Sequence, residues 1–304
     1  MVKSKALTAD TKKKLTGIVF VLPVTIVLLL MMVFPILQVF IFSFSNIKLP
    51  YFELSFAGFD NFINAFSRPE VSLVVINTIV WMVVFVLMRL LFGLGAALIM
   101  NANENAKGVA VLRVVALLPW TVPSIVSANL WRWMLQSDFG VINGTLRALG
   151  LDKFALTWLG STTTALPSIL IAATWFGYPF VMIMLLSAMQ NLPEEVYEAA
   201  KIDGANGFNL VRYIMMPGIK PVLVVVFILD LMAAINSFDM IFIMTGGGPA
   251  GVTEILSLFI YRLAFTNLDF ASASAVSVVL ILIPILCFCL YAHVQRLFKK
   301  KRST

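Results

Sequence analysis

The sequence predicts an all-α polytopic membrane protein with six transmembrane helices. Three observations support this: 61% of the residues are hydrophobic, only 12% are charged, and the mean hydropathy is +0.98. A soluble domain carries about 25% charged residues, so a soluble fold of this size could not bury so much apolar surface. The apolar runs are long and continuous, without the alternation of a barrel strand, and they therefore predict helices.

Six runs are long enough to cross a lipid bilayer, which takes about 20 apolar residues. We expect spans at 17–44, 72–100, 109–135, 163–190, 218–244 and 270–292. The first run is longer than the ~7–15-residue core of a cleavable signal peptide, so we expect it to remain in the protein. The predicted domains are a basic N-terminal segment at 1–16, a transmembrane domain at 17–292 and a basic tail at 293–304.

The distribution of Lys and Arg predicts the orientation of these spans. Fifteen of these residues fall on the side that holds both termini, six fall on the opposite side, and Arg89 lies within a span. By the positive-inside rule both termini and the loop 191–217 are cytoplasmic. The net charge of +7 therefore reflects membrane orientation, and we expect no nucleic-acid partner.

The sequence offers no convincing catalytic or metal centre, so we expect no enzyme activity. Cys287 and Cys289 share one apolar run, as packing residues do, and His293 stands at the end of the last span, where an interfacial position explains it. The segment Gly246–Thr253 nearly matches a phosphate-binding loop, but Val252 occupies the position that requires Lys. We expect a flexible turn at the outer face instead.

The loop between the fourth and fifth spans has clear local signals. Pro193 followed by acidic residues predicts a helix start, Gly204 predicts its end, and a second short helix at 208–215 is expected to stop at Pro217. The first helix carries a narrow apolar stripe of Val196, Ala199 and Ala200. Such a stripe suits docking into another protein, or packing on its own bundle, and these residues alone leave both open.

The same loop resembles the EAA motif of permeases from binding-protein-dependent ATP-binding-cassette (ABC) importers. The matching residues are Glu198-Ala199-Ala200, Gly204, Ile214 and Met216-Pro217, where the family usually has Leu in place of Met216. Further resemblance to the carbohydrate branch, which includes the maltose permeases, extends over most of the chain. It is found at Phe59-Asp60-Asn61-Phe62, Asn77-Thr78, Pro119-Trp120, Pro123, Trp131 and Gly246-Gly247-Gly248-Pro249.

This resemblance implies a type I ABC importer permease fold in a bacterial cytoplasmic (inner) membrane. It implies a second, homologous permease subunit, an ABC ATPase dimer that holds ATP and Mg, an extracytoplasmic solute-binding protein and a carbohydrate substrate. It also implies that the cytoplasmic loop docks on the ATPase. The residues expected to couple the two proteins are Glu198, Ala199, Ala200, Asp203, Gly204 and Pro217.

Polar groups inside the spans are costly in lipid and are expected to face the bundle interior. Arg89 and Asp230 fall at similar depths, at ~1.5 Å per residue, so they either pair or find other partners. A solute pathway is expected at Trp175, Gly177, Tyr178, Phe180, Asn236, Ser237 and Asp239, although helix packing also explains the aromatic residues. The alternative function is an ion-coupled secondary transporter without an ATPase, with its ion site at Arg89, Asp230 and Asp239.

Overall fold

The computed structural model describes residues 9–48, 50–51, 53–102 and 108–302. These residues form two compact units. One unit contains the described residues up to Ser67 together with Leu263–Val279, and the other contains Arg68–Arg262 together with the described residues from Leu280. Three of the basic residues used above for orientation, Lys3, Lys5 and Lys107, lie outside the described residues.

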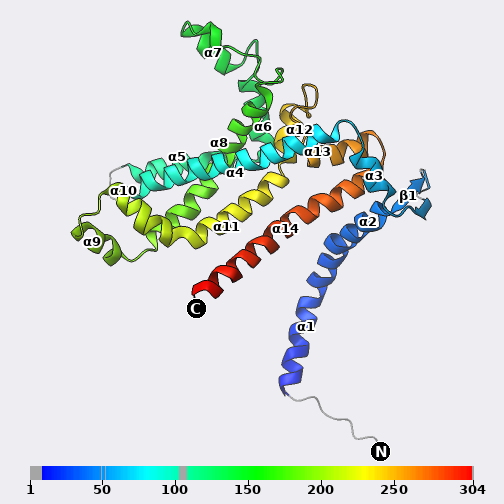
Figure 1. Ribbon diagram of the computed structural model, residues 1–304, viewed down its shortest axis with the longest axis horizontal. Helices are drawn as coiled ribbons and strands as arrows, with labels where there is room; N and C mark the ends of the chain where they lie inside the picture. The colour runs from blue at the N-terminus through cyan, green and yellow to red at the C-terminus, as the bar shows by residue number, and fades with distance from the viewer. Residues whose placement is uncertain (1–8, 49, 52, 103–107, 303–304) are drawn as a thin grey trace, which may run out of the picture. The chain divides into compact units, whose positions relative to one another are not determined.

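The first unit begins with a long apolar helix (Figure 1). It is made of α1 (Ala9–Leu28), a π-helical turn η1 (Leu29–Val33) and α2 (Phe34–Ser43). Its apolar part, Thr16–Ser43, has 28 residues with a mean hydropathy of 2.9, which confirms the first predicted span. The helix starts at Ala9, so the described part of the predicted N-terminal segment, 9–16, is helical.

A small hairpin and a short helix follow this span. Strands β1 (Ser45–Lys48) and β2 (Glu53–Phe56) are antiparallel, and α3 (Asp60–Phe66) comes next. Asn61 is buried and its Nδ2 donates to the carbonyl oxygens of Ser43 at 3.1 Å and Ser45 at 2.9 Å. The amide therefore ties α3 to the end of the span, and within the described residues this hairpin is the sole departure from an all-α fold.

The second unit is a helical bundle. Its long helices are α4 (Val71–Ala102), α8 (Ala165–Gln190) and α11 (Met216–Ile235), which lie alongside one another in Figure 1. The shorter elements are α5 (Val109–Thr121), α6 (Ser124–Met134), α7 (Val141–Ala148), η2 (Asp152–Phe154), α9 (Glu194–Ile202), α10 (Gly207–Leu210), η3 (Val211–Met215), α12 (Phe238–Met244) and α13 (Leu256–Tyr261).

Helix α8 is the most deeply buried span of this bundle, with 61% of its apolar window covered by the chain itself. Small residues allow α4 to approach it: a Cβ on Gly93 would collide with the side chain of Val181. Nearby, the indole Nε1 of fully buried Trp81 donates to the carbonyl oxygen of Ala234 at 3.1 Å. These contacts tie α4 to α8 and to α11, and they hold the polar groups of the three helices in one interior.

The predicted third span, 109–135, is not one straight helix. Helices α5 and α6 meet at an angle of 95°. The break falls at Val122 and Pro123, which both have extended backbone with ψ of 133° and 141°. The ring of a proline disfavours a helical conformation in the residue before it, so Pro123 ends α5, whereas Pro119 is tolerated inside the helix.

The predicted boundaries of the fifth span, 218–244, are also wrong. The continuous helix runs from Gly207 to Ile235 through Pro217, which was expected to stop the preceding helix. The π-helical turn η3 leads into α11, and Pro217 lies at this junction, so the helix continues through the proline. The helix ends at Asn236 and Ser237, whose side chains donate to carbonyl oxygens four residues earlier.

The sixth predicted span, 270–292, lies within α14 (Phe270–Arg302). The sequence is predominantly apolar from Phe270 to Ala292, and the helix is continuous over that range. The structure thus contains four continuous helices long and apolar enough to span a membrane, a fifth span if α5 and α6 count as one, and α14, all within the described residues.

Candidate functional site

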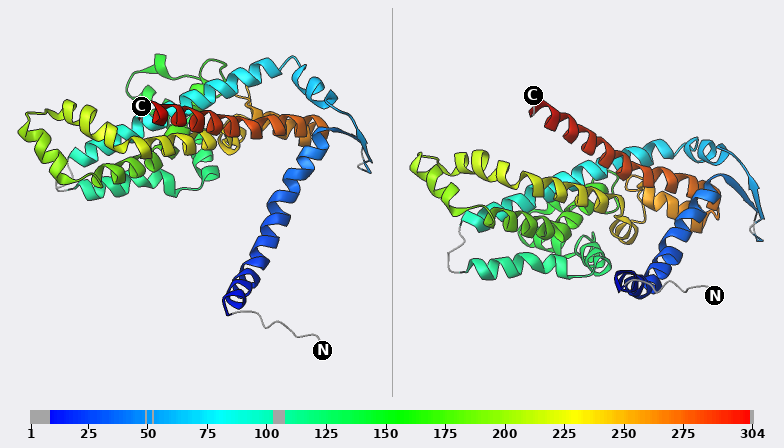
Figure 2. Two further views of the ribbon diagram at one scale, coloured as in Figure 1. Left: turned by 60° about the horizontal axis from the view of Figure 1, so that its bottom comes forward. Right: turned by 90° about the horizontal axis from the view of Figure 1, so that it is seen from below.

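The loop between α8 and α11 stands at one end of the second unit (Figures 1 and 2). Helix α9 begins directly after Pro193, with two glutamates in its first turn. It ends at Gly204, whose φ of +77° is a conformation that glycine adopts without strain. The N–H groups of Asp203 and Ala205 cap the helix by donating to the carbonyls of Ala199 and Ala200 at 3.0 and 2.9 Å.

One face of α9 packs on its own chain. The hydroxyl of Tyr197 donates to the carbonyl of Met189 at 3.2 Å, and Ala200 is only 8% exposed. Among the predicted coupling residues, Ala200 is therefore covered by the chain itself. The exposed ones are Glu198, Ala199, Asp203, Gly204 and Pro217.

Large apolar side chains are exposed next to these residues. Ile202 is 85% exposed, and Phe208, at the start of α10, is 69% exposed. The loop also carries charged residues, so it does not resemble the uniformly apolar surface of the spans. Exposed apolar side chains on a polar loop are typical of a surface that contacts another protein.

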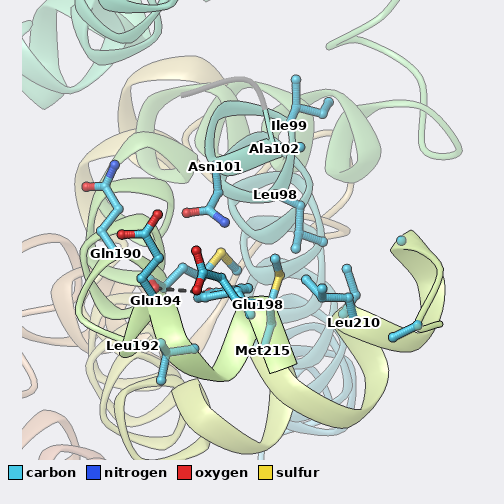
Figure 3. A pocket seen from close by; sticks show the side chains of 15 residues that line it. Leu98, Ile99, Asn101, Ala102, Gln190, Leu192, Glu194, Glu198, Leu210 and Met215 are labelled. Carbon is cyan, nitrogen blue, oxygen red and sulfur yellow. Dashed lines mark hydrogen bonds between the residues drawn. The ribbon is translucent and has the colours of Figure 1, made fainter. Parts of the chain in front are cut away.

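A cavity of about 790 Å³ separates α9 from the end of α4. Glu194 and Glu198 of α9 point toward Asn101 of α4 in Figure 3, and Leu98 and Met215 supply apolar walls. Glu198, which was predicted as a coupling residue, thus lines this cavity on the inner side of α9. The cavity leaves α9 without tight packing against the end of α4.

On its C-terminal side the loop continues directly into the helix that reaches the bundle interior. Helix α10, η3 and α11 form one unbroken helix from Gly207 to Ile235. Asp230 lies near the far end of that helix.

A second cavity, of about 490 Å³, lies inside the bundle around Asp230. Helices α4, α5, α6, α8, α11 and α12 contribute its walls. Its polar residues are Arg89, Ser124, Asp230, Asn236, Ser237 and Asp239, and its aromatic residues are Phe85, Trp120, Phe176 and Phe180. We call it the interior cavity.

Arg89 and Asp230 meet at this cavity. Arg89 Nη1 lies 3.1 Å from Asp230 Oδ1, and the two side chains are 7% and 1% exposed. Arg89 Nη2 also donates to the carbonyl oxygen of Gly177 at 2.9 Å, and the guanidinium lies over the ring of Phe85 at 4.7 Å. One ion pair therefore joins α4, α8 and α11, the three long helices of the unit.

The four predicted solute-pathway residues of α8 have different positions. Phe180 lines the interior cavity, with its ring 5.9 Å from that of Trp120. Trp175 packs against Trp131 at 5.8 Å, and the hydroxyl of Tyr178 donates to the carbonyl of Ala116 at 3.2 Å. Neither lines the cavity, and Gly177 contributes through its contact with Arg89.

The three predicted residues after α11, Asn236, Ser237 and Asp239, all line the interior cavity. Sequence reasoning missed Ser124, whose hydroxyl donates to Asp239 Oδ2 at 3.0 Å across the helix break after Pro123. Its signal in the sequence was the position directly after that proline, where a new helix begins.

Side-chain hydrogen bonds hold the segment Gly246–Thr253, which was expected to be a turn at the outer face. Thr253 is fully buried, its hydroxyl donates to the carbonyl of Gly248 at 2.9 Å and lies 2.8 Å from the hydroxyl of Thr245. The next residue, Glu254, forms two hydrogen bonds with Arg262, at 2.7 and 3.0 Å. Buried polar groups that pair with one another hold the segment in one conformation.

Solved structures with this fold are ABC importers. The chain superposes on a bacterial ABC transporter involved in the import of the acidic polysaccharide alginate with a TM-score of 0.84, at 22% identity, covering 94% of this chain and 97% of that chain. The methionine transporter MetNI, in inward-facing conformations, gives a TM-score of 0.55 at 20% identity, covering 76% and 98%. These similarities establish the type I importer permease fold.

Sequence relatives cover nearly the whole chain. The trehalose/maltose transport system permease protein MalF of Thermococcus litoralis is 35% identical over 281 residues, which are 92% of this chain and 93% of that protein. The sulfoquinovosyl glycerol transport system permease protein SmoG of Agrobacterium fabrum is 29% identical over 94% and 92%. The family described as "Binding-protein-dependent transport system inner membrane component" matches residues 89–301. With more than two thirds of its length inside that match, the chain belongs to the family of inner-membrane components of binding-protein-dependent transport systems.

Proposed function

We propose that this chain is one of two permease subunits of an ATP-driven carbohydrate importer, and that ATPase subunits bind its α9 loop. The observation that carries the proposal is the exposure of Ile202 and Phe208 on a loop that continues directly into α11. A protein bound at these side chains moves α10, and the rigid helix transmits that movement to the interior cavity. Both termini are then cytoplasmic, in agreement with the excess of Lys and Arg on that side.

The solute pathway of the proposed importer passes through the interior cavity. Sugars present a CH face that stacks on aromatic rings and hydroxyls that need hydrogen-bond partners. The rings of Trp120 and Phe180 and the polar groups of Asn236 and Asp239 supply both in one cavity. The relatives with trehalose/maltose and sulfoquinovosyl glycerol in their names support a carbohydrate solute.

The partners in this proposal are a second permease, an ATPase dimer that holds ATP and Mg²⁺, and an extracytoplasmic solute-binding protein. A solved relative of the same fold is an alginate transporter in complex with its periplasmic protein, which supports the last of these. The ion-coupled secondary transporter gains no support from the comparisons, because the matching family depends on a binding protein.

A pair of glycine substitutions tests the ATPase docking. Gly204 and Gly150 both have positive φ, +77° and +70°, and an added Cβ would meet no atom within 4 Å at either position. The backbone strain of Gly204→Arg and Gly150→Arg is therefore matched, but only Gly204 lies on the α9 loop. With this chain tagged and co-expressed with its importer subunits, Gly204→Arg is expected to lose the ATPase on purification and to lose ATP-driven uptake.

The control variant, Gly150→Arg, is expected to retain the ATPase. Membrane insertion is measured for both by the amount of tagged chain in the membrane fraction. Wild-type amounts of ATPase with Gly204→Arg would contradict docking at α9. Membrane sidedness is tested separately with a cysteine at position 203 or 152 in a background without Cys287 and Cys289. A membrane-impermeant maleimide is expected to label position 152 in intact cells and position 203 only in inverted vesicles.

A further inference from the structure

The interior cavity has a net negative charge from its own residues. Its charged residues are one guanidinium, Arg89, and two carboxylates, Asp230 and Asp239, which sum to a formal charge of −1. The positive charge of Arg89 is already paired within the protein. Its Nη1 lies 3.1 Å from Asp230 Oδ1, and its Nη2 donates to the carbonyl oxygen of Gly177 at 2.9 Å. An anion that enters the cavity therefore meets a neutralised arginine and the second carboxylate.

The ion pair still has hydrogen-bonding capacity that the protein does not use. Arg89 Nε and Asp230 Oδ2 have no hydrogen-bond partner in the part of the chain that the structure describes, although both residues are more than nine-tenths buried. Buried polar atoms without partners are rare because desolvating them is unfavourable. Both residues line the interior cavity, but these two atoms are covered by neighbouring groups in this structure. A hydroxyl group donates and accepts, so a sugar hydroxyl suits both atoms once the neighbouring side chains move aside.

Resting on the carbohydrate-transport function proposed above, we infer that the Arg89–Asp230 pair, together with Asp239, is a specificity element that admits uncharged sugars and excludes sugars that carry a carboxylate or sulfonate. The solved relative that imports alginate transports an acidic polysaccharide, whereas the name of the Thermococcus litoralis relative contains two uncharged sugars. Fold and family therefore leave the charge of the solute open, and the charges in the interior cavity decide it for this chain.

The direct test is competition binding to the purified complex of permeases and ATPases, with the solute-binding protein left out so that its own selectivity does not contribute. The labelled probes are maltose and trehalose. The competitors are the same two sugars unlabelled and their derivatives in which one C6 hydroxymethyl group is oxidised to a carboxylate. The carboxylate forms are expected to compete about tenfold more weakly, because an unpaired buried charge is strongly disfavoured.

Two variants separate specificity from structural support. Asp230→Asn frees the guanidinium and brings the formal charge of the cavity to zero, so the ratio of the two affinities is expected to shift about tenfold toward the carboxylate forms. Asp239→Asn removes a carboxylate from an exposed position without touching the pair, and it is expected to shift the ratio in the same direction by a smaller factor. A purely structural pair would lower both affinities together and leave the ratio unchanged.

The possible failures are distinguishable. Equal or stronger competition by the carboxylate forms in the wild-type complex would overturn the inference and leave the carbohydrate function intact. An unchanged ratio in Asp239→Asn would also overturn it, even if Asp230→Asn does not fold. If no sugar of either kind binds to the complex or enters proteoliposomes with ATP, the proposed function and the inference both fail.

Discussion

The guanidinium of Arg89 lies where a Cβ on Gly177 would be. The missing side chain of Gly177 lets Arg89 cross from α4 to α8, donate to the carbonyl of Gly177 and reach Asp230 of α11. A buried charge is tolerated inside a bundle only when it is paired and hydrogen-bonded. The glycine is therefore a requirement of the ion pair.

Substitution of Gly177 by alanine is expected to displace Arg89 and to lower the free energy of unfolding by about 1–3 kcal/mol, the usual cost of overpacking a buried site. The measurement is thermal unfolding of the purified chain in detergent. Gly95→Ala is the matched control, because Gly95 lies in α4 and its added Cβ meets no atom within 4 Å. Alanine there is expected to be neutral or to stabilise the helix by about 0.5–1 kcal/mol. Equal changes in the free energy of unfolding for the two substitutions would show that the contact between Gly177 and Arg89 does not contribute to stability.

The outer segment is expected to depend on the hydroxyl of Thr253. Valine has the same shape but leaves the carbonyl of Gly248 without its donor and removes the hydroxyl contact with Thr245, whose own hydroxyl keeps the carbonyl of Ile241. Thr253→Val is therefore expected to cost about 1–3 kcal/mol and to speed protease cleavage between α12 and α13. In the control, Thr25→Val, the lost hydrogen bond is exposed and local to one helix, so little change is expected. Resistance of Thr253→Val to protease at the wild-type rate would argue against this anchoring.

We expect the coupling of ATP hydrolysis to transport to depend on the stiffness of the helix where η3 continues into α11. At position 217 of this continuous helix alanine (Pro217→Ala) is a good helix former, whereas glycine (Pro217→Gly) weakens the helix by about 1 kcal/mol relative to alanine, a factor of about five in the population of the unbroken helix. Under the proposed function, the glycine variant should hydrolyse ATP normally but transport less solute for each ATP consumed. The alanine variant should stay close to wild type. Identical ratios of solute to ATP in the two variants would contradict transmission through this helix.

Phe208 is expected to be an anchor of the ATPase contact. Phe208→Asp places a charge where the proposed interface is apolar, and loss of at least about 2 kcal/mol of binding is expected, as for an aromatic hot spot. Phe139, 74% exposed in the segment between α6 and α7, provides the control Phe139→Asp. Co-purification of the ATPase with each variant at equal expression is the measurement. Retention of the ATPase by Phe208→Asp would remove this side chain from the interface.

Local sequence information predicted most of the spans and the shape of α9. Hydropathy sums over neighbouring residues, so the helices 16–43, 71–102 and 165–190 were predicted to within a few residues. The helix end at Gly204 was likewise predictable, because a turn with positive φ favours glycine whatever surrounds it.

The breaks between helices were harder to predict. The presence of a proline does not by itself show whether a helix ends before it or continues through it. That depends on whether neighbouring groups can bond to the carbonyl oxygen that loses its N–H partner. Pro217 therefore proved compatible with a continuous helix and Pro123 did not.

By itself the sequence determined that the chain enters lipid, which segments do so and where the α9 loop lies along the chain, because these properties depend on composition and on neighbouring residues. Only the tertiary structure decided that Arg89 meets Asp230 beside Gly177, and that Ser124 meets Asp239. These partners are far apart in the chain. Their meeting depends on how closely α4, α8 and α11 pack and on the angle between α5 and α6, which no local pattern encodes.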